Sequence, residues 1–585
     1  MSRNDEVADL LEEFADLLEA TGVEYKPSAY RRAAENVREY PAPIENLAGE
    51  GTDAVAGIDR VGDAIASKVV EYFETGSIAE LEELRSELPV DMPALTRVEG
   101  VGPKTVGALY EALGVTTLDE LEAAAEAGEI SEVTGFGEKT EANVLENVPF
   151  AREAAKRTRL GDARPVADAA LAYLADVDGV AKVEVGGSIR RWKATIGDVD
   201  LLVASADGEA VVDAFVDWPD ADATIEAGTG KASVRADGTR VDLRVVDVAE
   251  FGAALQYFTG SKEHNIAVRN RAIGRSLKVN EYGVFDVSDV DDPDAGQRVG
   301  ERVAGETEAG VYEALDMAWM PPEIRENTGE VEAAAAETEG SLPALLEEGD
   351  VRGDLHTHTD WSDGGFTIAE MVAAAAERGY AFHAVTDHAA GPGVFGNTGL
   401  DEAAIAEQAD AVASVVDDAP IEVFHGIEAN IDAAGAITTD DATLASLDLV
   451  VASPHSALGQ GSDAATERLV RAVEHPEVDV LGHPTGRLIN SRQGLEPDFE
   501  AVAEAAAAAD TAIEVNANPA RLDADGDAVR AAIDAGATIA VNTDAHSPRE
   551  FDNVRYGVHT ARRGWAERAD VLNTRSPEEL RAFFG

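Results

Sequence analysis

Imidazole and carboxylate side chains gather in the C-terminal part of this sequence, since ten of its eleven histidines lie beyond residue 350. Most of these side chains stand directly after short apolar runs that predict β-strands, such as residues 449–451 and 539–541. When parallel strands form a barrel, residues at their carboxyl ends meet in one place. We therefore predict that nine residues meet there: His356, His358, Asp363, His388, Glu428, His455, His483, Asp544 and His546.

Six imidazoles and three carboxylates are more ligands than one ion uses, so this set predicts a cluster of two or three metal ions. Mixed nitrogen and oxygen ligands favour manganese, zinc or iron over magnesium or calcium, and we expect Mn²⁺ or Zn²⁺. Such ions lower the pKa of bound water and stabilise the displacement of a phosphate group. A single histidine at a strand end is more often structural, and we interpret four others in this way: His383, His425, His475 and His559.

A second set of acidic residues lies in the middle of the chain. Asp198 and Asp200 are two residues apart on a predicted strand, so alternation places both carboxylates on one face. Asp242 lies in another strand-like run, residues 240–246. Three converging carboxylates repel one another unless divalent cations lie among them, which is the arrangement that two-metal phosphoryl transfer requires. Oxygen ligands completed by substrate phosphates suit Mg²⁺.

The residues before these carboxylates are of the types that bind phosphate. Gly187 allows close approach of the backbone, and Ser188 offers a hydroxyl group. Arg190 and Arg191 add positive charge. An Asp-x-Asp pair alone is weak evidence, because such pairs usually lie at a solvated strand edge. The whole stretch of residues 186–200 is much more specific.

Three segments near the N-terminus share a plan of helix, tight turn and helix. They are Arg60-Val61-Gly62, Gly100-Val101-Gly102 followed by Lys104, and Gly135-Phe136-Gly137 followed by Lys139. The helix after each turn presents free N–H groups, which form a ready phosphate site. One such segment alone is more often a plain turn, but three copies predict helix-hairpin-helix binding to the DNA backbone. The first copy departs from the pattern, because Ile58-Asp59-Arg60 replaces the expected apolar residue and glycine.

The middle of the chain resembles the nucleotidyltransferase core of the family X DNA polymerases, of which DNA polymerase beta is the best-known member. The motifs that carry the resemblance are Gly187-Ser188, Arg190-Arg191, Asp198-x-Asp200, Asp242, Tyr257-Phe258-Thr259-Gly260-Ser261, Asn265 and Arg269. The resemblance implies that Asp198, Asp200 and Asp242 are catalytic magnesium ligands, and that Asp242 assists deprotonation of the primer 3′-hydroxyl. It also implies a nucleotide site that consists of Gly187, Ser188, Arg191, Tyr257, Phe258, Gly260 and Asn265.

In that family the Tyr-Phe pair packs under the incoming deoxyribose, and the residues that match Asn265 and Arg269 contact the base and the template strand. Residues 95–102 also resemble the family's second hairpin. DNA contacts are therefore implied for Gly100, Gly102, Lys104, Gly135, Gly137, Lys139 and Arg269. Lys68 falls where polymerase beta has the Schiff-base lysine of its lyase. Lyase chemistry is one interpretation of Lys68, and a DNA-facing or solvated lysine is the other.

Residues 351–550 resemble the polymerase and histidinol phosphatase (PHP) domain, with all nine of its ligand positions filled. The most specific signals are His356-x-His358, Thr386-Asp387-His388 and Asp544-x-His546. A polymerase core followed by a PHP domain is the order of the bacterial and archaeal family X enzymes. The resemblance implies 3′–5′ exonuclease activity and 3′-end processing, usually with manganese, and in some relatives cleavage at abasic sites.

These patterns predict a chain of several domains. We expect an α-helical helix-hairpin-helix part, an α+β nucleotidyltransferase palm like that of polymerase beta, and a C-terminal α/β PHP barrel of the distorted (βα)7 type. A double proline followed by a polar, alanine-rich stretch indicates a boundary before the barrel. The expected segments are 1–85 and 86–150 for two helix-hairpin-helix parts, 151–250 for the palm, 251–325 for nucleotide selection, 326–350 for a linker and 351–585 for the PHP domain.

The sequence has no cysteine, which excludes disulfides, zinc fingers and thiol catalysis. Its 113 acidic and 47 basic residues give a formal net charge of -66, and the acid is spread along the whole chain. We interpret this charge as adaptation to molar salt in a halophile, where self-repulsion is screened. No apolar stretch is long enough to cross a bilayer, so we expect a cytoplasmic protein. The family resemblance favours a monomer.

These observations predict a repair polymerase that fills short gaps, as in base excision repair. Its substrates would be dNTPs and gapped or nicked double-stranded DNA, and its PHP site would trim 3′ ends. One alternative is a DNA-bound nuclease or phosphoesterase whose polymerase core only holds DNA. A second is a non-catalytic scaffold that recruits repair partners. A third, a small-molecule phosphatase, leaves the first 330 or so residues unexplained. The intact carboxylates argue against the first alternative and the filled ligand positions against the second.

Overall fold

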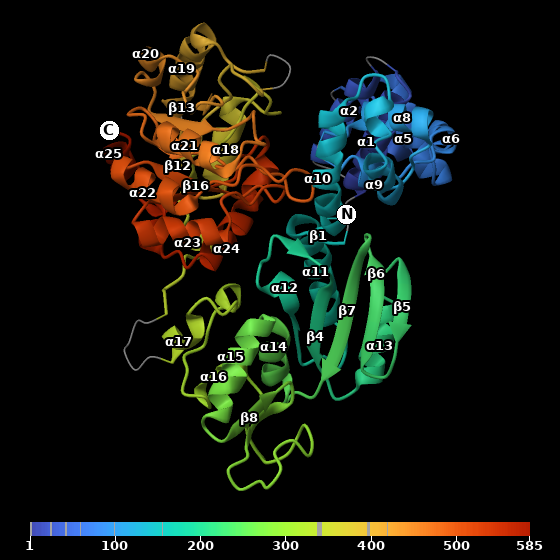
Figure 1. The fold of residues 1–585 in the computed structure, drawn as a ribbon, viewed down its shortest axis with the longest axis vertical. Coiled ribbons are helices and arrows are strands. Elements are labelled where there is room, and N and C mark those ends of the chain that lie inside the picture. Colours follow the sequence, from blue (N-terminus) through green and yellow to red (C-terminus); the bar gives the residue numbers. More distant parts are fainter. Residues whose placement is uncertain are drawn as a thin grey trace. The chain divides into compact units, whose positions relative to one another are not determined.

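The protein forms two compact units in a computed structural model (Figure 1). The structure describes residues 3–23, 26–40, 44–58, 60–98, 100–154, 156–335, 342–394, 398–417 and 419–585. The first unit is Met1–Thr158 with Asn490–Gln493, and the second is Arg159–Ile489 with Gly494–Gly585. Among the helices of the described residues, none combines the length and the apolar character needed to cross a membrane.

The first unit is mainly helical. Its helices are α1 (Arg3–Ala20), α2 (Lys26–Glu39), α3 (Ile44–Glu50), α4 (Thr52–Val55), α5 (Asp63–Thr75), α6 (Ala79–Glu87), α7 (Met92–Leu95), α8 (Pro103–Leu113), α9 (Leu118–Glu126), the short 3₁₀ helix η1 (Ile130–Glu132) and α10 (Glu138–Ala154). The three predicted hairpin turns are present, because α5, α8 and α10 each begin directly after the last glycine of a turn segment. Apolar side chains of these helices share one core, in which the rings of Phe14 and Tyr30 stack.

The first hairpin keeps its turn although a glycine is missing from it. Arg60 adopts a φ of 59°, in the left-handed region that Gly100 (79°) and Gly135 (99°) occupy at the equivalent place. A residue with a Cβ atom costs roughly 1–2 kcal/mol in this conformation. The departure from the pattern therefore strains the backbone of this copy but leaves its turn in place. Asp59 lies outside the described residues.

Arg60→Gly is expected to stabilise the first hairpin by about 0.5–1 kcal/mol, because relief of strain exceeds the greater conformational entropy of glycine in the unfolded chain. Arg60→Ala is the matched control, since it removes the same side chain and keeps the strained backbone. Hydrogen exchange of the α5 amides in the full-length protein measures the difference. Equal protection in the two variants would contradict this account.

The second unit begins with a palm built on a five-stranded sheet of order β2-β4-β7-β6-β5. Strands β4 and β7 are parallel, and the other neighbours are antiparallel. The elements are α11 (Leu160–Ala175), β2 (Lys182–Val185), α12 (Gly187–Arg190), β3 (Thr195–Ile196), β4 (Val199–Ala204), α13 (Gly208–Val216), β5 (Ala223–Ala227), β6 (Lys231–Ala236) and β7 (Thr239–Val246). Apolar residues of α11 and α13 pack with those of the sheet in one core. This packing holds the sheet in place and with it the loop that leads into β4.

A smaller subdomain follows the palm. It contains α14 (Phe251–Thr259), α15 (Lys262–Ile273), the antiparallel strands β8 (Leu277–Asn280), β9 (Gly283–Asp286) and β10 (Glu301–Ala304), then α16 (Glu308–Glu313), η2 (Pro322–Ile324) and α17 (Glu330–Ala334). Helix α17 lies inside the segment that we expected to be a linker. Its Val331 and Ala334 belong to the apolar core of this subdomain, so the packed part continues past residue 326. Residues 336–341 of the expected linker lie outside the described residues.

The last part of the chain is the predicted distorted barrel. Its seven parallel strands follow one another in sequence order from β11 to β17, and a bridge between Thr357 and Ala545 joins the first strand region to the last. The strands are β11 (Gly353–Asp354), β12 (Phe382–Val385), β13 (Glu422–Asn430), β14 (Leu449–Ser453), β15 (Val480–Leu481), β16 (Ala512–Asn516) and β17 (Ile539–Asn542). Every residue of β12 and β14 is buried, as expected of parallel strands that helices cover on the outside.

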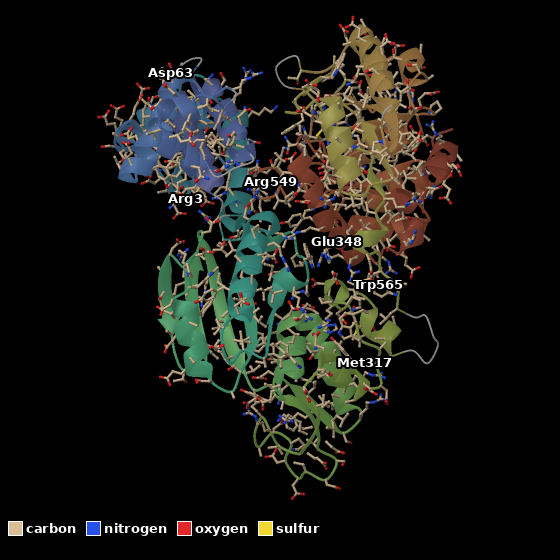
Figure 2. All side chains as sticks on the ribbon, turned by 180° about the vertical axis from the view of Figure 1, so that it is seen from behind. Arg3, Asp63, Met317, Glu348, Arg549 and Trp565 are labelled. Carbon is tan, nitrogen blue, oxygen red and sulfur yellow. The ribbon has the colours of Figure 1, made fainter. Side chains whose placement is uncertain are left out.

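Helices alternate with these strands. They are α18 (Ile368–Glu377), α19 (Glu402–Val416), α20 (Asp441–Leu444), α21 (Ser462–Val473), α22 (Phe499–Ala509), α23 (Gly526–Ala535), α24 (Val554–Arg563) and α25 (Pro577–Phe583). Four of them begin at an aspartate whose side chain accepts backbone N–H bonds: Asp401, Asp440, Asp498 and Asp525. Part of the acidic composition therefore caps helices, where negative charge is favourable. Figure 2 shows oxygen-tipped side chains along the outside of both units.

Candidate active sites

The palm sheet brings three carboxylates together. Asp200 in β4 and Asp242 in β7 are direct partners in the parallel register. The sequence predicted that Asp198 lies on the same strand as Asp200. It lies instead just before β4, but its carboxylate is still close to those of Asp200 and Asp242. One oxygen from each carboxylate lies within 4.8 Å of the others.

The three carboxylates repel one another, although the charges of nearby arginines offset part of this repulsion. Burial, together with the negative charges of Asp198 and Asp242, raises the pKa of Asp200 to about 7. Arg240 Nε donates to Asp242 Oδ1 at 2.8 Å, which compensates one of the three carboxylates. Oxygen ligands that repel one another in this way fit divalent cations, and Mg²⁺ prefers such ligands.

Gly187 is required for this geometry. Its φ is 58°, and a Cβ atom at this position would lie 2.2 Å from Asp200 Oδ2. The backbone turn before α12 therefore lies directly against one of the carboxylates. Ser188 follows in α12 and is partly exposed, so its hydroxyl remains accessible to a ligand.

A cavity of about 220 Å³ adjoins the carboxylates, with Asp200, Asp242, Arg244 and Phe258 among its lining residues. The guanidinium carbon of Arg244 lies 4.4 Å from the centroid of the Phe258 ring. The aromatic side chain and the carboxylates therefore line one space, which is large enough for part of a ligand and open to solvent.

The Tyr257-Phe258 turn at the end of α14 is fixed by a side-chain amide. Asn265 Nδ2 donates to the Tyr257 carbonyl oxygen at 2.8 Å, and a Cβ atom on Gly260 would lie 2.8 Å from Asn265 Oδ1. Asn265 thus holds the backbone of the Tyr257-Phe258 turn. Arg269 lies on the same helix, α15, and is exposed.

The two neighbouring arginines of the phosphate motif have different partners. Arg190 forms a nearly buried ion pair with Glu308, at 2.7 Å between Nη1 and Oε1. Its charge is therefore used inside the protein, and our expectation that it faces phosphate is wrong for this structure. Arg191 Nε donates to Glu326 Oε1 at 3.0 Å, and its charge offsets part of the rise in the pKa of Asp200, so it lies near the carboxylates.

Apart from Arg269, the residues expected to contact DNA lie in the helical unit. All six are exposed: Gly100, Gly102, Lys104, Gly135, Gly137 and Lys139. Lys68 differs from them, because its side chain is 14% exposed and its Nζ lies 2.7 Å from Glu80 Oε2. Burial lowers the pKa of Lys68, but Glu80 and Tyr30 outweigh this effect and raise it. A Schiff-base lysine must react as the neutral amine, so this environment does not favour the lyase interpretation.

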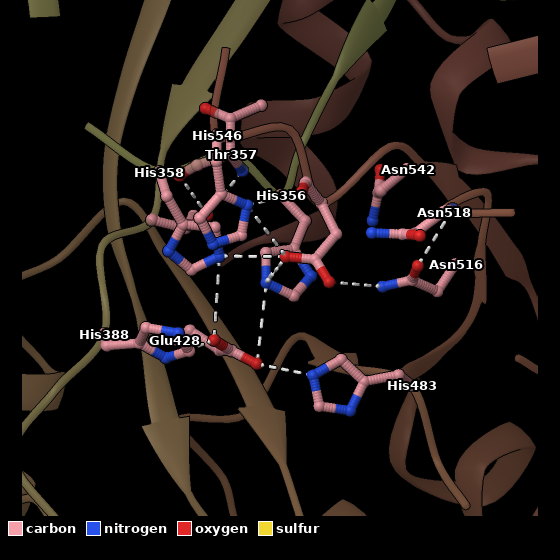
Figure 3. A network of polar contacts seen from close by, with 12 residues as sticks. His356, Thr357, His358, His388, Glu428, His483, Asn516, Asn518, Asn542 and His546 are labelled. Carbon is pink, nitrogen blue, oxygen red and sulfur yellow. Dashed lines mark hydrogen bonds and ion pairs between the residues drawn. The ribbon is translucent and has the colours of Figure 1, made fainter. Parts of the chain in front are cut away.

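The barrel brings all nine predicted ligands of the C-terminal part to the carboxyl ends of its strands. Figure 3 shows Glu428 of β13 between His388 and His483, with His356 and His358 above it. Its Oε2 is 2.6 Å from His388 Nδ1, and its Oε1 is 2.8 Å from His483 Nε2 and 3.1 Å from His455 Nε2. Asp544 and Asp363 occupy the other side of the cluster, with Asp544 Oδ1 3.1 Å from His358 Nε2 and Asp363 Oδ2 3.3 Å from His388 Nε2.

Three overlapping ligand groups can be distinguished in this cluster. They are His358, Asp363, His388 and His546; His356, His358 and Glu428; and His388, Glu428 and His455. Within each group the ligand atoms lie within 4.8 Å of one another. His358, His388 and Glu428 are each shared by two groups. This sharing fits a set of residues that would together hold up to three cations.

The donor atoms of the cluster also lack the partners that buried polar atoms normally have. Both oxygens of Glu428 and the Nε2 atoms of His356, His358 and His455 are buried without a well-formed hydrogen bond among the described residues. Unpaired buried polar atoms are costly, and metal ions would satisfy them. The three neighbouring histidines His388, His455 and His356 outweigh burial and hold the pKa of Glu428 well below its usual value.

The four histidines that we interpreted as structural lie outside the ligand groups. His383 is fully buried, and burial lowers its pKa to about 3. His425 and His475 contact Gln408 and Asp441, respectively. His559 contacts Glu323 at 2.7 Å.

One carboxylate of the barrel site was missed by the sequence analysis. Glu514 of β16 is fully buried, and its Oε1 lies 2.8 Å from His356 Nδ1. Its Oε2 accepts the backbone N–H of His483 at 2.7 Å. Strand β16 is the one strand of the seven that holds no predicted ligand near its end, and an acid in the apolar run of residues 511–515 was the available signal. Glu514 orients His356 so that Nε2 faces the cluster.

Glu514→Gln is expected to weaken Mn²⁺ binding by about 10- to 100-fold, because an amide is a poorer acceptor for the imidazole N–H. Calorimetric titration of the full-length protein with Mn²⁺ measures this change. The control is Asp479→Asn, which alters another largely buried barrel carboxylate that accepts the Val450 N–H and lies outside the ligand groups. An equal loss in both variants would indicate general loosening and contradict the role of Glu514.

Models of known protein families match several parts of the chain. Four family models match: a DNA polymerase beta thumb over residues 254–326, a helix-hairpin-helix domain over 2–78, a SAM-like helix-hairpin-helix tandem over 92–147, and a PHP domain over 354–518. The chain is 34% identical over 585 residues to the DNA polymerase/3′-5′ exonuclease PolX of Bacillus subtilis, a match that covers 99% of this chain and 98% of that protein.

Two further relatives match separate parts. DNA polymerase lambda of Rattus norvegicus is 24% identical over 339 residues, 55% of this chain and 56% of that protein. A probable phosphatase of Syntrophotalea carbinolica is 33% identical over 168 residues, 28% of this chain and 64% of that protein.

Proposed function

The chain belongs to the family X DNA polymerases that carry a C-terminal PHP domain, and from this premise we propose how its residues divide polymerase and 3′–5′ exonuclease activity. The observation that carries the proposal is that one chain holds two separate ligand sets, three carboxylates in the palm and an imidazole-rich cluster in the barrel. The first suits Mg²⁺ and the second Mn²⁺ or Zn²⁺.

In the palm, Asp198, Asp200 and Asp242 would hold Mg²⁺, which supplies activation of the primer 3′-hydroxyl and neutralisation of the transferred phosphates. Asp242 assists removal of the hydroxyl proton. Ser188 and Arg191 bind the triphosphate, and the backbone at Gly187 approaches it closely. Tyr257, Phe258 and Gly260 form the surface under the sugar of the nucleotide. Asn265 holds the Tyr257 carbonyl in the free protein and contacts the base when the nucleotide is bound.

In the barrel, the nine ligand residues would hold two or three Mn²⁺ or Zn²⁺ ions, which supply an activated water and charge stabilisation for cleavage of a phosphodiester bond. The protein's part is to fix each donor. The Nδ1 atoms of His356, His455 and His546 are held by Glu514, Asn430 and the Asp544 carbonyl oxygen, respectively. These contacts direct the three Nε2 atoms toward the cluster.

The DNA substrate is held through its backbone. Free N–H groups after the Gly-x-Gly turns, with Lys104 and Lys139, bind phosphates without reading sequence. Arg269 contacts the template strand. We propose that the protein acts on gapped or nicked duplexes in base excision repair and does so at high salt. We also propose that it works as a monomer in the cytoplasm, where DNA and dNTPs are present. The domain boundaries are proposed as the sequence predicts them, with the packed subdomain extended through α17.

Extension of a primer in a one-nucleotide gap tests the repair role. We expect a higher kcat/KM on a gapped duplex than on the same primer with a long open template, because two DNA ends engage the hairpins at once. Arg269→Ala should lower extension on both substrates. Equal efficiency of the wild-type protein on gapped and open templates would contradict a gap-filling role.

A further inference from the structure

Helix α24 of the barrel lies against the palm turn that carries Arg191. The indole of Trp192 stacks on the His559 ring, with centroids 3.7 Å apart and planes 5° from parallel. Arg563 Nη1 donates to the carbonyl oxygen of Arg191 at 2.8 Å. Two residues of α24 therefore contact this turn: Arg563 binds the backbone at Arg191, and His559 stacks on the side chain of Trp192.

The same turn is held a second time through Glu326, which follows η2. Glu326 Oε1 accepts from Arg191 Nε at 3.0 Å and lies 3.3 Å from Arg563 Nη1 and 3.5 Å from Lys193 Nζ. The side chains of Arg191, Glu326 and Arg563 are only 13%, 20% and 15% exposed, so solvent screens their charges weakly. Arg563 thus contacts both Arg191 and the acid that orients its guanidinium.

The remaining contacts of Arg191 restrict it to one orientation. Its Nη1 donates to the Thr259 carbonyl oxygen at 2.7 Å, next to the Tyr257-Phe258 pair. Its Nη2 has no hydrogen-bond partner among the described residues. Trp192, the next residue, has a φ of 52°, a conformation that is unfavourable unless neighbouring contacts hold it.

A second anchor keeps α24 in place. Glu323 of η2 is 3% exposed, and its Oε1 lies 2.7 Å from His559 Nδ1 and 2.8 Å from Arg562 Nε. Arg562 and Arg563 are therefore adjacent arginines that each bind an acid of the polymerase part, but only Arg563 contacts Arg191 and Glu326. This difference provides an internal control.

We propose that Arg563, a residue of the PHP barrel, is a positioning residue of the polymerase site. It fixes Arg191 through the Arg191 carbonyl and Glu326, so that the free edge of the guanidinium meets the triphosphate of an incoming dNTP. Fixing a charged group before binding lowers the entropy that binding must remove. This inference rests on the proposed role of Arg191 in triphosphate binding.

The test is steady-state addition of one nucleotide by the full-length protein. Arg563→Ala is expected to raise the KM for dNTP about 10-fold while kcat changes by less than about two-fold, because nucleotide binding is weakened and the carboxylates are untouched. Arg563→Lys should recover part of the affinity. Arg562→Ala, the matched control, should leave the KM within about two-fold. Wild-type exonuclease activity in Arg563→Ala would show that the barrel remains folded.

A double-mutant comparison separates this inference from the function on which it rests. If Arg191 acts on the triphosphate, Arg191→Ala raises the KM, and adding Arg563→Ala to it causes little further change. An unchanged KM in Arg191→Ala would refute the proposed role of Arg191. A raised KM in Arg191→Ala with an unchanged KM in Arg563→Ala, or equal shifts in Arg562→Ala and Arg563→Ala, would refute the positioning role of Arg563 alone.

Discussion

Asp200→Asn is expected to reduce templated nucleotide addition about a thousand-fold, while shortening of a 3′ end continues at the wild-type rate. The carboxylate of Asp200 lies near those of Asp198 and Asp242, and together they would hold the divalent cations that phosphoryl transfer needs. An amide of the same size cannot replace that charge. Single-turnover primer extension with Mg²⁺ measures the loss.

The stability of this variant distinguishes a lost ligand from a lost fold. Burial and repulsion by Asp198 and Asp242 raise the pKa of Asp200 to about 7, so above that pH the metal-free protein carries an ionised Asp200 whose charge destabilises the fold. Metal-free Asp200→Asn should therefore resist heat at least as well as the wild type at pH 8. Asp213→Ala, which removes an exposed carboxylate from α13, should change neither property. Lower thermal stability together with lost extension would contradict a ligand role.

Glu428→Gln is expected to reduce 3′–5′ exonuclease activity about a thousand-fold or more and to leave polymerisation unchanged. Glu428 is the central carboxylate of the barrel, within 3.1 Å of His388, His455 and His483. Loss of its charge would leave two of the three ligand groups without a carboxylate. Digestion of a 5′-labelled strand with Mn²⁺ provides the rate.

Metal content shows whether this effect arises at the cluster. Glu428→Gln should bind fewer Mn²⁺ ions per chain than the wild type, and added Mn²⁺ should not restore the exonuclease. Asp479→Asn serves again as a control, since it alters a largely buried barrel carboxylate outside the ligand groups. Full exonuclease activity in a Glu428→Gln protein with reduced metal content would contradict this assignment.

The sequence predicts the parts of this protein that depend on short motifs. The end of a parallel strand is a fixed place, so His356, Glu428 and Asp544 could be brought together from the apolar runs before them. Two strand-like runs likewise predicted that Asp200 and Asp242 converge, and the structure pairs them directly in parallel strands. The close approach of the backbone at Gly187 was predicted from the residue type, and a Cβ atom there would lie 2.2 Å from Asp200 Oδ2.

Other features depend on contacts between distant segments, and no local pattern reveals them. Glu514 orients a histidine that lies 158 residues earlier, and Arg563 contacts the turn at Arg191 across 372 residues. The partner of Arg190 is Glu308, so an arginine that sequence assigns to phosphate is used inside the protein. Arg60 shows the reverse case, in which a turn persists without its glycine although its backbone keeps a left-handed φ of 59°.

Two separate sites in one chain would extend and shorten the same kind of DNA end. The most direct test of this division uses a 5′-labelled primer with a mismatched 3′ terminus in a short gap, with dNTPs, Mg²⁺ and Mn²⁺ at high KCl. We expect the wild type to remove the mismatch and then extend the primer. Asp200→Asn should only shorten the primer, and Glu428→Gln should leave the mismatch in place but extend a matched primer. Loss of both activities in either variant, in a protein that remains folded, would contradict the division into two sites.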